Sequence, residues 1–106
     1  MARVLLVDDD PVQLELRRMI LEHAGHEVQT AETAQQAMER SAGCDVAVMD
    51  LIPQHSELSA ALPDDMRLIV LSGRDPEPGM RADKVLKKPC ASKLLLAAIE
   101  AYGFPR

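Results

Sequence analysis

Short runs of aliphatic residues alternate along the chain with stretches in which apolar residues recur at helical spacing. Three runs, residues 3–7, 45–50 and 67–71, are almost continuously apolar, which is typical of strands buried on both faces of a parallel sheet. Residues 27–31 and 85–88 are shorter candidates for strands of the same sheet. Because parallel neighbours need crossover connections, the alternation predicts an α/β fold, with helices covering both faces of a five-stranded parallel sheet.

Capping residues mark where the predicted helices begin. Asp10 and Pro11 indicate the start of the first helix, because aspartate accepts hydrogen bonds from the free amides of the first turn and proline loses no needed donor there. Gly25 can end that helix. Thr33 predicts the cap of a second helix that runs to about residue 41, and Ser92 the cap of the last helix, which ends near Gly103. We expect these side chains to face inward: Val12, Leu16, Met19 and Ile20; Ala34, Ala37 and Met38; Leu95, Ala98, Ile99 and Tyr102.

Two connections are short for this kind of fold. Pro53 and Pro63 bracket a brief third helix, over residues 55–62. Residues 73–84, which join the fourth and fifth strands, barely reach the dozen or so residues that a parallel crossover needs. We therefore expect the fourth crossover helix to be absent, or to be a single turn near residues 80–84.

The length of 106 residues predicts one domain, residues 1–106. Apolar residues make up 47% and charged residues 27%, as in a soluble globular domain. The longest apolar run, residues 94–99, is far too short to span a membrane. Residues 8–10 are acidic and interrupt the chain before a signal-peptide core can form, so we expect a cytoplasmic protein.

The net charge of −5 is unevenly distributed along the chain. Residues 1–53 carry −6 and residues 54–106 carry +1, and no basic stripe is present, which argues against direct binding of nucleic acid. Two cysteines, Cys44 and Cys90, are too few for a disulfide framework. We expect all three histidines at the surface: His23, His26 and His55.

Polar residues stand where the predicted strands end. Asp8–Asp10 follow the first strand, Asp50 closes the third, Ser72 follows the fourth and Lys88 closes the fifth. Ligands of parallel sheets bind beyond these carboxyl ends. Clustered carboxylates suit a hard cation such as Mg²⁺, and a lysine with a hydroxyl would clamp a phosphoryl group. An aspartate in this setting can itself be the nucleophile that forms an acyl phosphate.

Four segments, in this order, resemble the receiver domain of bacterial two-component response regulators: residues 5–11, 48–51, 69–73 and 86–89. The resemblance covers the whole chain and implies a doubly wound, flavodoxin-like sheet with strand order 2-1-3-4-5. It implies a phosphorelay domain that a histidine kinase or phosphotransfer protein phosphorylates, and that signals by contact with an unknown downstream protein. Such a domain catalyses only its own phosphorylation and dephosphorylation, and it needs neither a membrane nor nucleic acid.

The resemblance also implies residue roles at the metal and the nucleophile. Asp50 would be the phosphoacceptor. Mg²⁺ would be bound by Asp9 directly, by Asp8 largely through water, by Asp50, and by the backbone carbonyl of Ile52. Asp10 is assigned to the helix cap instead.

Further residues would surround the phosphoryl group. Ser72 would donate its hydroxyl to that group, and Lys88 would pair with Asp50 or its phosphate. Gly73 is small enough to leave the phosphoryl group accessible. Arg74 either flanks the group and limits access of water or is an ordinary solvated arginine.

Three departures from the family pattern favour an alternative, and the short helices are one of them. Pro53 comes three residues after Asp50, where the family usually has its proline at four, and Val85 stands where the family often has an aromatic switch residue. A receiver fold that acts as an interaction module without phosphorylation would tolerate all three, whereas the intact site residues oppose this alternative: Asp9, Asp50, Ser72 and Lys88.

The other alternative is a haloacid-dehalogenase-type phosphatase. Residues 6–12 resemble the nucleophile motif of that class, with Asp8 as the nucleophile. The absence of an acidic pair after Lys88 and of room for a cap domain argues against it.

Overall fold

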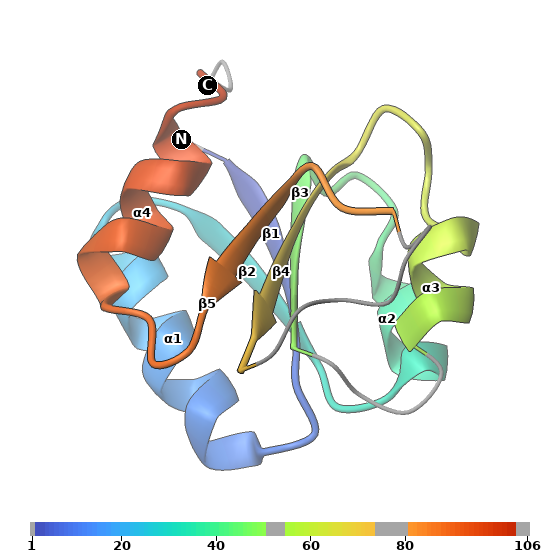
Figure 1. Cartoon of the computed structure of the whole chain (residues 1–106), viewed down its shortest axis with the longest axis horizontal. Helices are drawn as coiled ribbons and strands as arrows, with labels where there is room; N and C mark the ends of the chain where they lie inside the picture. The colour runs from blue at the N-terminus through green and yellow to red at the C-terminus, as the bar shows by residue number, and fades with distance from the viewer. Residues whose placement is uncertain (1, 51–54, 74–80, 104–106) are drawn as a thin grey trace.

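The computed structural model describes residues 2–50, 55–73 and 81–103. Its five strands form one sheet in the order β2-β1-β3-β4-β5, and every neighbouring pair is parallel (Figure 1). The strands are β1 Arg3–Val7, β2 Glu27–Ala31, β3 Val46–Asp50, β4 Arg67–Ser72 and β5 Lys84–Lys87. The predicted flavodoxin-like sheet and its strand order are confirmed.

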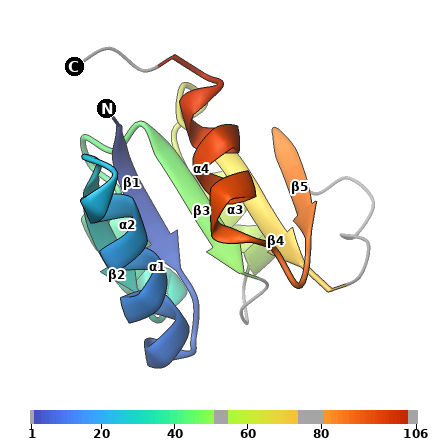
Figure 2. The ribbon, with the colours of Figure 1, turned by 90° about the vertical axis from the view of Figure 1, so that its left-hand side faces the viewer.

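Four helices lie on the two faces of this sheet in the described ranges: α1 Pro11–His23, α2 Ala34–Arg40, α3 His55–Ala61 and α4 Ser92–Glu100. Helices α1 and α4 cover one face, and α2 and α3 cover the other (Figures 1 and 2). None of the helices in the described ranges is long and apolar enough to cross a membrane.

The sheet separates two hydrophobic cores, which explains why its central strands are apolar throughout. Alternate residues of a strand point to opposite faces. Val4 and Leu6 therefore pack beneath α1 and α4, and Leu5 and Val7 pack towards α2 and α3. All four of these side chains are buried, because neither face of β1 meets solvent.

Helix α1 turns a different face inward from the one that the sequence predicts. Leu14 and Leu21 are buried, and Arg17 lies on the same stripe with its side chain only 19% exposed. The prediction was wrong because this inner stripe contains an arginine, whereas the stripe that periodicity favours is purely apolar. The side chains of that apolar stripe are exposed instead, except for the half-buried Ile20: Val12 64%, Leu16 51% and Met19 56%.

The other helices follow the sequence more closely. Leu95, Ala98 and Ile99 of α4 are buried, as expected, and Tyr102 packs against the same core. In α2, Ala37 is buried and Ala34 packs against the core beside it, whereas Met38, which was expected to be inward, is 42% exposed.

Two of the three predicted helix caps are confirmed. The side chain of Asp10 accepts a hydrogen bond from the backbone N–H of Val12 at 3.0 Å, and that of Thr33 accepts one from Gln36 at 3.1 Å. Ser92 is the first residue of α4 and not its cap. Ala91 takes the capping position, where it has no side-chain oxygen to offer.

His26 is buried, contrary to the expectation that all three histidines lie at the surface. It is 6% exposed, and its Nδ1 accepts a hydrogen bond of 2.9 Å from the backbone N–H of Ala2. The bond secures the start of β1 against β2, a long-range role that the local sequence does not reveal. His23 is exposed and His55 is half-buried.

The connection before β5 contains no helix within residues 81–83, and β5 begins at Lys84. Of the two expectations for the fourth crossover helix, the single turn near residues 80–84 is wrong for residues 81–84, where its absence is observed; residues 74–80 lie outside the described ranges. Arg81 instead fastens this segment to the end of α3, whose predicted shortness is confirmed. Its guanidinium donates to four backbone carbonyls: those of Ser59, Leu62, Pro63 and Met66.

Candidate functional site

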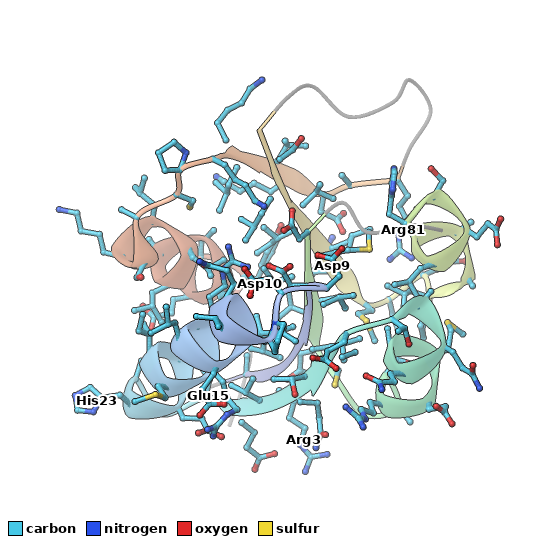
Figure 3. All side chains as sticks on the ribbon, turned by 90° about the horizontal axis from the view of Figure 1, so that it is seen from below. Arg3, Asp9, Asp10, Glu15, His23 and Arg81 are labelled. Atoms are coloured by element: carbon cyan, nitrogen blue, oxygen red, sulfur yellow. The ribbon has the colours of Figure 1, made fainter. Side chains whose placement is uncertain are left out.

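The carboxyl ends of the strands bring the predicted site residues to one edge of the sheet. Asp8 follows β1, Asp50 ends β3, Ser72 ends β4 and Lys88 follows β5 directly. Figure 3 looks onto this edge and labels Asp9 and Asp10 where the chain passes from β1 into α1. An open pocket of about 620 Å³ lies here, lined by Asp8, Asp9, Asp10, Gln13, Arg17, Asp50, Lys88, Pro89 and Cys90.

Lys88 joins the ends of three strands. Its Nζ donates to Oδ2 of Asp50 at 2.5 Å, a charge-assisted hydrogen bond between residues 38 positions apart. Its backbone N–H donates to the carbonyl of Ser72 at 2.8 Å, which holds the chain after β5 against the end of β4. The side chain of Asp50 is 15% exposed and that of Lys88 is 35% exposed, so the pair lies at the pocket surface and remains accessible from solvent.

Asp8 is the buried carboxylate of the site, with 2% of its side chain exposed. Its Oδ1 accepts the backbone N–H of Asp10 at 3.0 Å, and its Oδ2 accepts Nη1 of Arg17 at 2.8 Å. Burial raises the pKa of Asp8, and the neighbouring carboxyl group of Asp50 raises it further, against the opposing effects of the two hydrogen bonds. Asp8 and Asp50 are thus close enough to repel each other when both are ionised.

Asp9 and Asp10 have different surroundings from Asp8. Both are exposed and line the pocket, but the Asp10 side chain is engaged in capping α1, as the sequence predicts. Asp9 therefore offers an exposed carboxylate on the same pocket as Asp8 and Asp50.

The carboxylate oxygens at this edge of the sheet are ligands of the type that Mg²⁺ prefers, because Mg²⁺ binds hard oxygen ligands from one or two carboxylates and keeps several waters. The described residues contain no group of three or more histidine, cysteine, aspartate or glutamate side chains close enough together to hold a metal. The facing carboxylates of Asp8 and Asp50 fit such an ion with water completing its shell. The carbonyl of Ile52, the fourth expected ligand, lies outside the described residues.

The residues predicted to surround a phosphoryl group are only partly described. Ser72 is 1% exposed at the end of β4, beside Lys87 in the sheet register. A Cβ added at Gly73 would meet no described atom within 4 Å, so the space beside it is open. Arg74 lies outside the described residues.

Sequence reasoning missed Arg17. An arginine between Leu14 and Leu21, three and four residues from them, was the available signal. A helix that turns this stripe inward carries the arginine towards the end of β1, where a carboxylate can pair with it.

Solved structures with the same fold are receiver domains. A response regulator receiver domain protein from Clostridium thermocellum is 24% identical, with a TM-score of 0.84, over 95% of this chain and 93% of that one. A CheY-like receiver domain protein from Methanospirillum hungatei JF-1 is 25% identical, with a TM-score of 0.75, over 96% and 93%. The receiver domain of a signal transduction histidine kinase from Syntrophus aciditrophicus is 23% identical, with a TM-score of 0.82, over 100% and 94%.

The chain therefore has the fold of response regulator receiver domains, as its sequence segments indicate. Comparison by sequence finds no matching family model and no matching curated protein.

Proposed function

We propose that this chain is a phosphoacceptor signalling domain of a two-component system, in which Asp50 accepts a phosphoryl group in a Mg²⁺-dependent reaction. The observation that carries the proposal is the 2.5 Å pair of Asp50 and Lys88, at the carboxyl edge of a receiver-type sheet and beside the carboxyl group of Asp8. The phosphoryl donor would be a histidine kinase or a phosphotransfer protein, and the output would be contact with a downstream protein.

The proposed step is a displacement at phosphorus. A carboxylate oxygen of Asp50 forms the new P–O bond while the bond between phosphorus and the donor's histidine nitrogen breaks, which leaves an acyl phosphate. Lys88 is already paired with Asp50 and would stay with the negative charge as it spreads onto the phosphoryl oxygens. Ser72, at the end of the neighbouring strand, would donate its hydroxyl to one of them.

Asp8 and Asp50 would hold the metal ion, and Asp9, on the same pocket, and the Ile52 carbonyl are proposed as its further ligands. Bound Mg²⁺ supplies positive charge that neutralises the transferring phosphoryl group. The role of Asp8 and Asp9 is to supply oxygen ligands, and Asp8 is held in place for this by the backbone N–H of Asp10.

The environment of Asp8 argues against the phosphatase alternative, in which Asp8 would be the nucleophile. Both of its carboxylate oxygens accept hydrogen bonds, and its side chain is 2% exposed, against 15% for that of Asp50. An oxygen that is buried and engaged in this way is poorly placed to attack an incoming phosphorus.

The test is the intact mass of the protein after incubation with acetyl phosphate, with and without Mg²⁺. We expect one phosphoryl adduct on the wild type that requires Mg²⁺, and none on Asp50→Ala, which lacks the nucleophile. Asp65→Ala is the matched control, because Asp65 is an exposed carboxylate of the loop before β4 and should leave the adduct intact.

A folded wild type that forms no adduct either accepts no phosphoryl group, as the interaction module would, or loses the adduct rapidly. Titration with beryllofluoride, a phosphoryl analogue that does not hydrolyse like an acyl phosphate, separates these two explanations. Binding of the analogue that depends on Asp50 retains the proposal, and absence of binding overturns it.

A further inference from the structure

Arg17 brings a second cation into the acidic site. Its Nη1 lies 2.8 Å from Oδ2 of Asp8, and the residue lines the same pocket as Asp50 and Lys88. Each carboxylate of the facing pair therefore has a cationic partner of its own: Lys88 for Asp50 and Arg17 for Asp8.

The position of Arg17 on α1 makes this pairing a built feature of the fold. Arg17 shares the inward stripe with the buried Leu14 and Leu21, and its side chain is only 19% exposed. A guanidinium at such a position loses much of its hydration, which is costly unless a carboxylate with good geometry compensates for it. Asp8, itself 2% exposed, is that carboxylate, so neither group of the pair is freely solvated.

A cation bound near Asp8 would meet this guanidinium. The Asp8 oxygen that faces Arg17 accepts its guanidinium N–H, and the other oxygen accepts the Asp10 N–H. Mg²⁺ would have to share or displace the Arg17 contact in order to use Oδ2. Even when it is held chiefly by Asp9 and Asp50, it would be repelled by a fixed positive charge in the same pocket.

We propose that Arg17 is a positioning residue that holds the Asp8 carboxylate and, through its charge, lowers the affinity of the site for Mg²⁺. The inference rests on the proposed function, because it concerns the metal ion that the phosphorylation step is proposed to need. Arg17 thereby sets the Mg²⁺ concentration at which the site becomes competent.

The experiment is calorimetric titration of the full chain with MgCl₂, which measures binding independently of phosphorylation. Removing one unit charge from within a few ångströms of a partly exposed site should tighten binding about three- to tenfold. We expect this decrease in Kd for Arg17→Gln. Arg17→Lys keeps the charge and should stay close to the wild type, which distinguishes an effect of charge from a merely structural one.

Arg18→Gln is the matched control. Arg18 is the next residue of α1 and pairs with Glu15 and Glu22, so the substitution removes the same charge from the same helix but not from the pocket. Its Mg²⁺ affinity should equal that of the wild type. Arg17→Met, whose apolar side chain suits the buried stripe, serves in place of Arg17→Gln if the latter does not fold.

Two failures would be distinguishable. In the first, the wild type binds Mg²⁺ and the folded variant, Arg17→Gln or Arg17→Met, binds it with the same or a lower affinity. This result would overturn the role of Arg17 and leave the proposed function standing. Absence of Mg²⁺ binding in the wild type, or binding that survives Asp9→Ala and Asp50→Ala together, would contradict the metal site of the proposed function itself.

Discussion

At the scale of single residues, Asp8 shows how the site is maintained at a cost to the fold. Burial and the carboxyl group of Asp50 raise the pKa of Asp8, so its ionised form is less favourable in the folded chain than in the unfolded one. The folded chain therefore binds more protons than the unfolded chain just above the ordinary aspartate pKa. The free energy of unfolding therefore falls as the pH rises from the ordinary aspartate pKa through the raised pKa of Asp8, and it recovers as the pH is lowered.

Replacement of Asp8 by asparagine tests this relation. Asp8→Asn removes the titrating group but also takes the carboxylate partner from Arg17, so the informative quantity is how its melting temperature relative to the wild type changes with pH. Relative to the wild type, the variant should be more stable at pH 8 than at pH 4, because the wild type becomes neutral at this position as the pH falls through the raised pKa of Asp8. Thermal unfolding of both proteins at pH 8 and at pH 4 measures this change.

Asp65→Asn is the control for that substitution, since it makes the same chemical change at an exposed carboxylate. It should alter the melting temperature little at either pH. A difference in melting temperature between Asp8→Asn and the wild type that is the same at both pH values, or that favours the variant more at pH 4, would contradict the account.

At the scale of elements, the orientation of α1 is the largest difference between the predicted and the observed fold. The helix itself was predictable, because Asp10 and Pro11 specify its start from neighbouring residues alone. Its inward face was not predictable, because the helix has two stripes that contain apolar residues and the buried stripe also contains Arg17. The contact that decides between them joins Arg17 to Asp8, and tertiary pairing of this kind has no periodic signal in the sequence.

Alanine substitutions along α1 test which stripe is buried. Leu14→Ala and Leu21→Ala should each lower the free energy of unfolding by about 2–5 kcal/mol, because they leave cavities in the core. Leu16→Ala and Met19→Ala, on the exposed stripe, should change it by no more than about 0.5 kcal/mol. Urea unfolding gives the four values. Larger losses in the free energy of unfolding at Leu16 and Met19 than at Leu14 and Leu21 would contradict the observed orientation of α1.

The short connection into β5 was also predictable only in part. Its length indicates that little or no helix could form, and residues 81–83 are indeed non-helical. What the sequence does not reveal is the compensation by Arg81, which satisfies backbone carbonyls around the end of α3. One arginine thereby ties the segment before β5 to an element about twenty residues earlier.

At the scale of the whole molecule, the parallel sheet accounts for most of what the sequence could predict. The three central strands are buried on both faces and apolar along almost their whole length, so their approximate bounds are visible without a structure. Parallel strands also end at one edge, so the placement of Asp8, Asp50 and Lys88 together follows from the same pattern. Both ends of the described chain lie at the opposite edge of the sheet from this site (Figure 1).

The parts that sequence reasoning could not supply depend on contacts between distant segments. His26 looks like an ordinary surface histidine until β1 and β2 are aligned, when its Nδ1 meets the Ala2 N–H. The missing cap at the start of α4 is another example, because Ser92 is suited to capping but lies one residue too late.

The central claim is that Asp50 is the residue that accepts the phosphoryl group, and locating the adduct tests it most directly. Borohydride reduces an acyl phosphate of aspartate to homoserine, which peptide mapping by mass spectrometry then identifies by position. After incubation with acetyl phosphate and Mg²⁺, the account predicts homoserine at position 50 and nowhere else. Homoserine at position 8 would contradict the account and revive the phosphatase alternative.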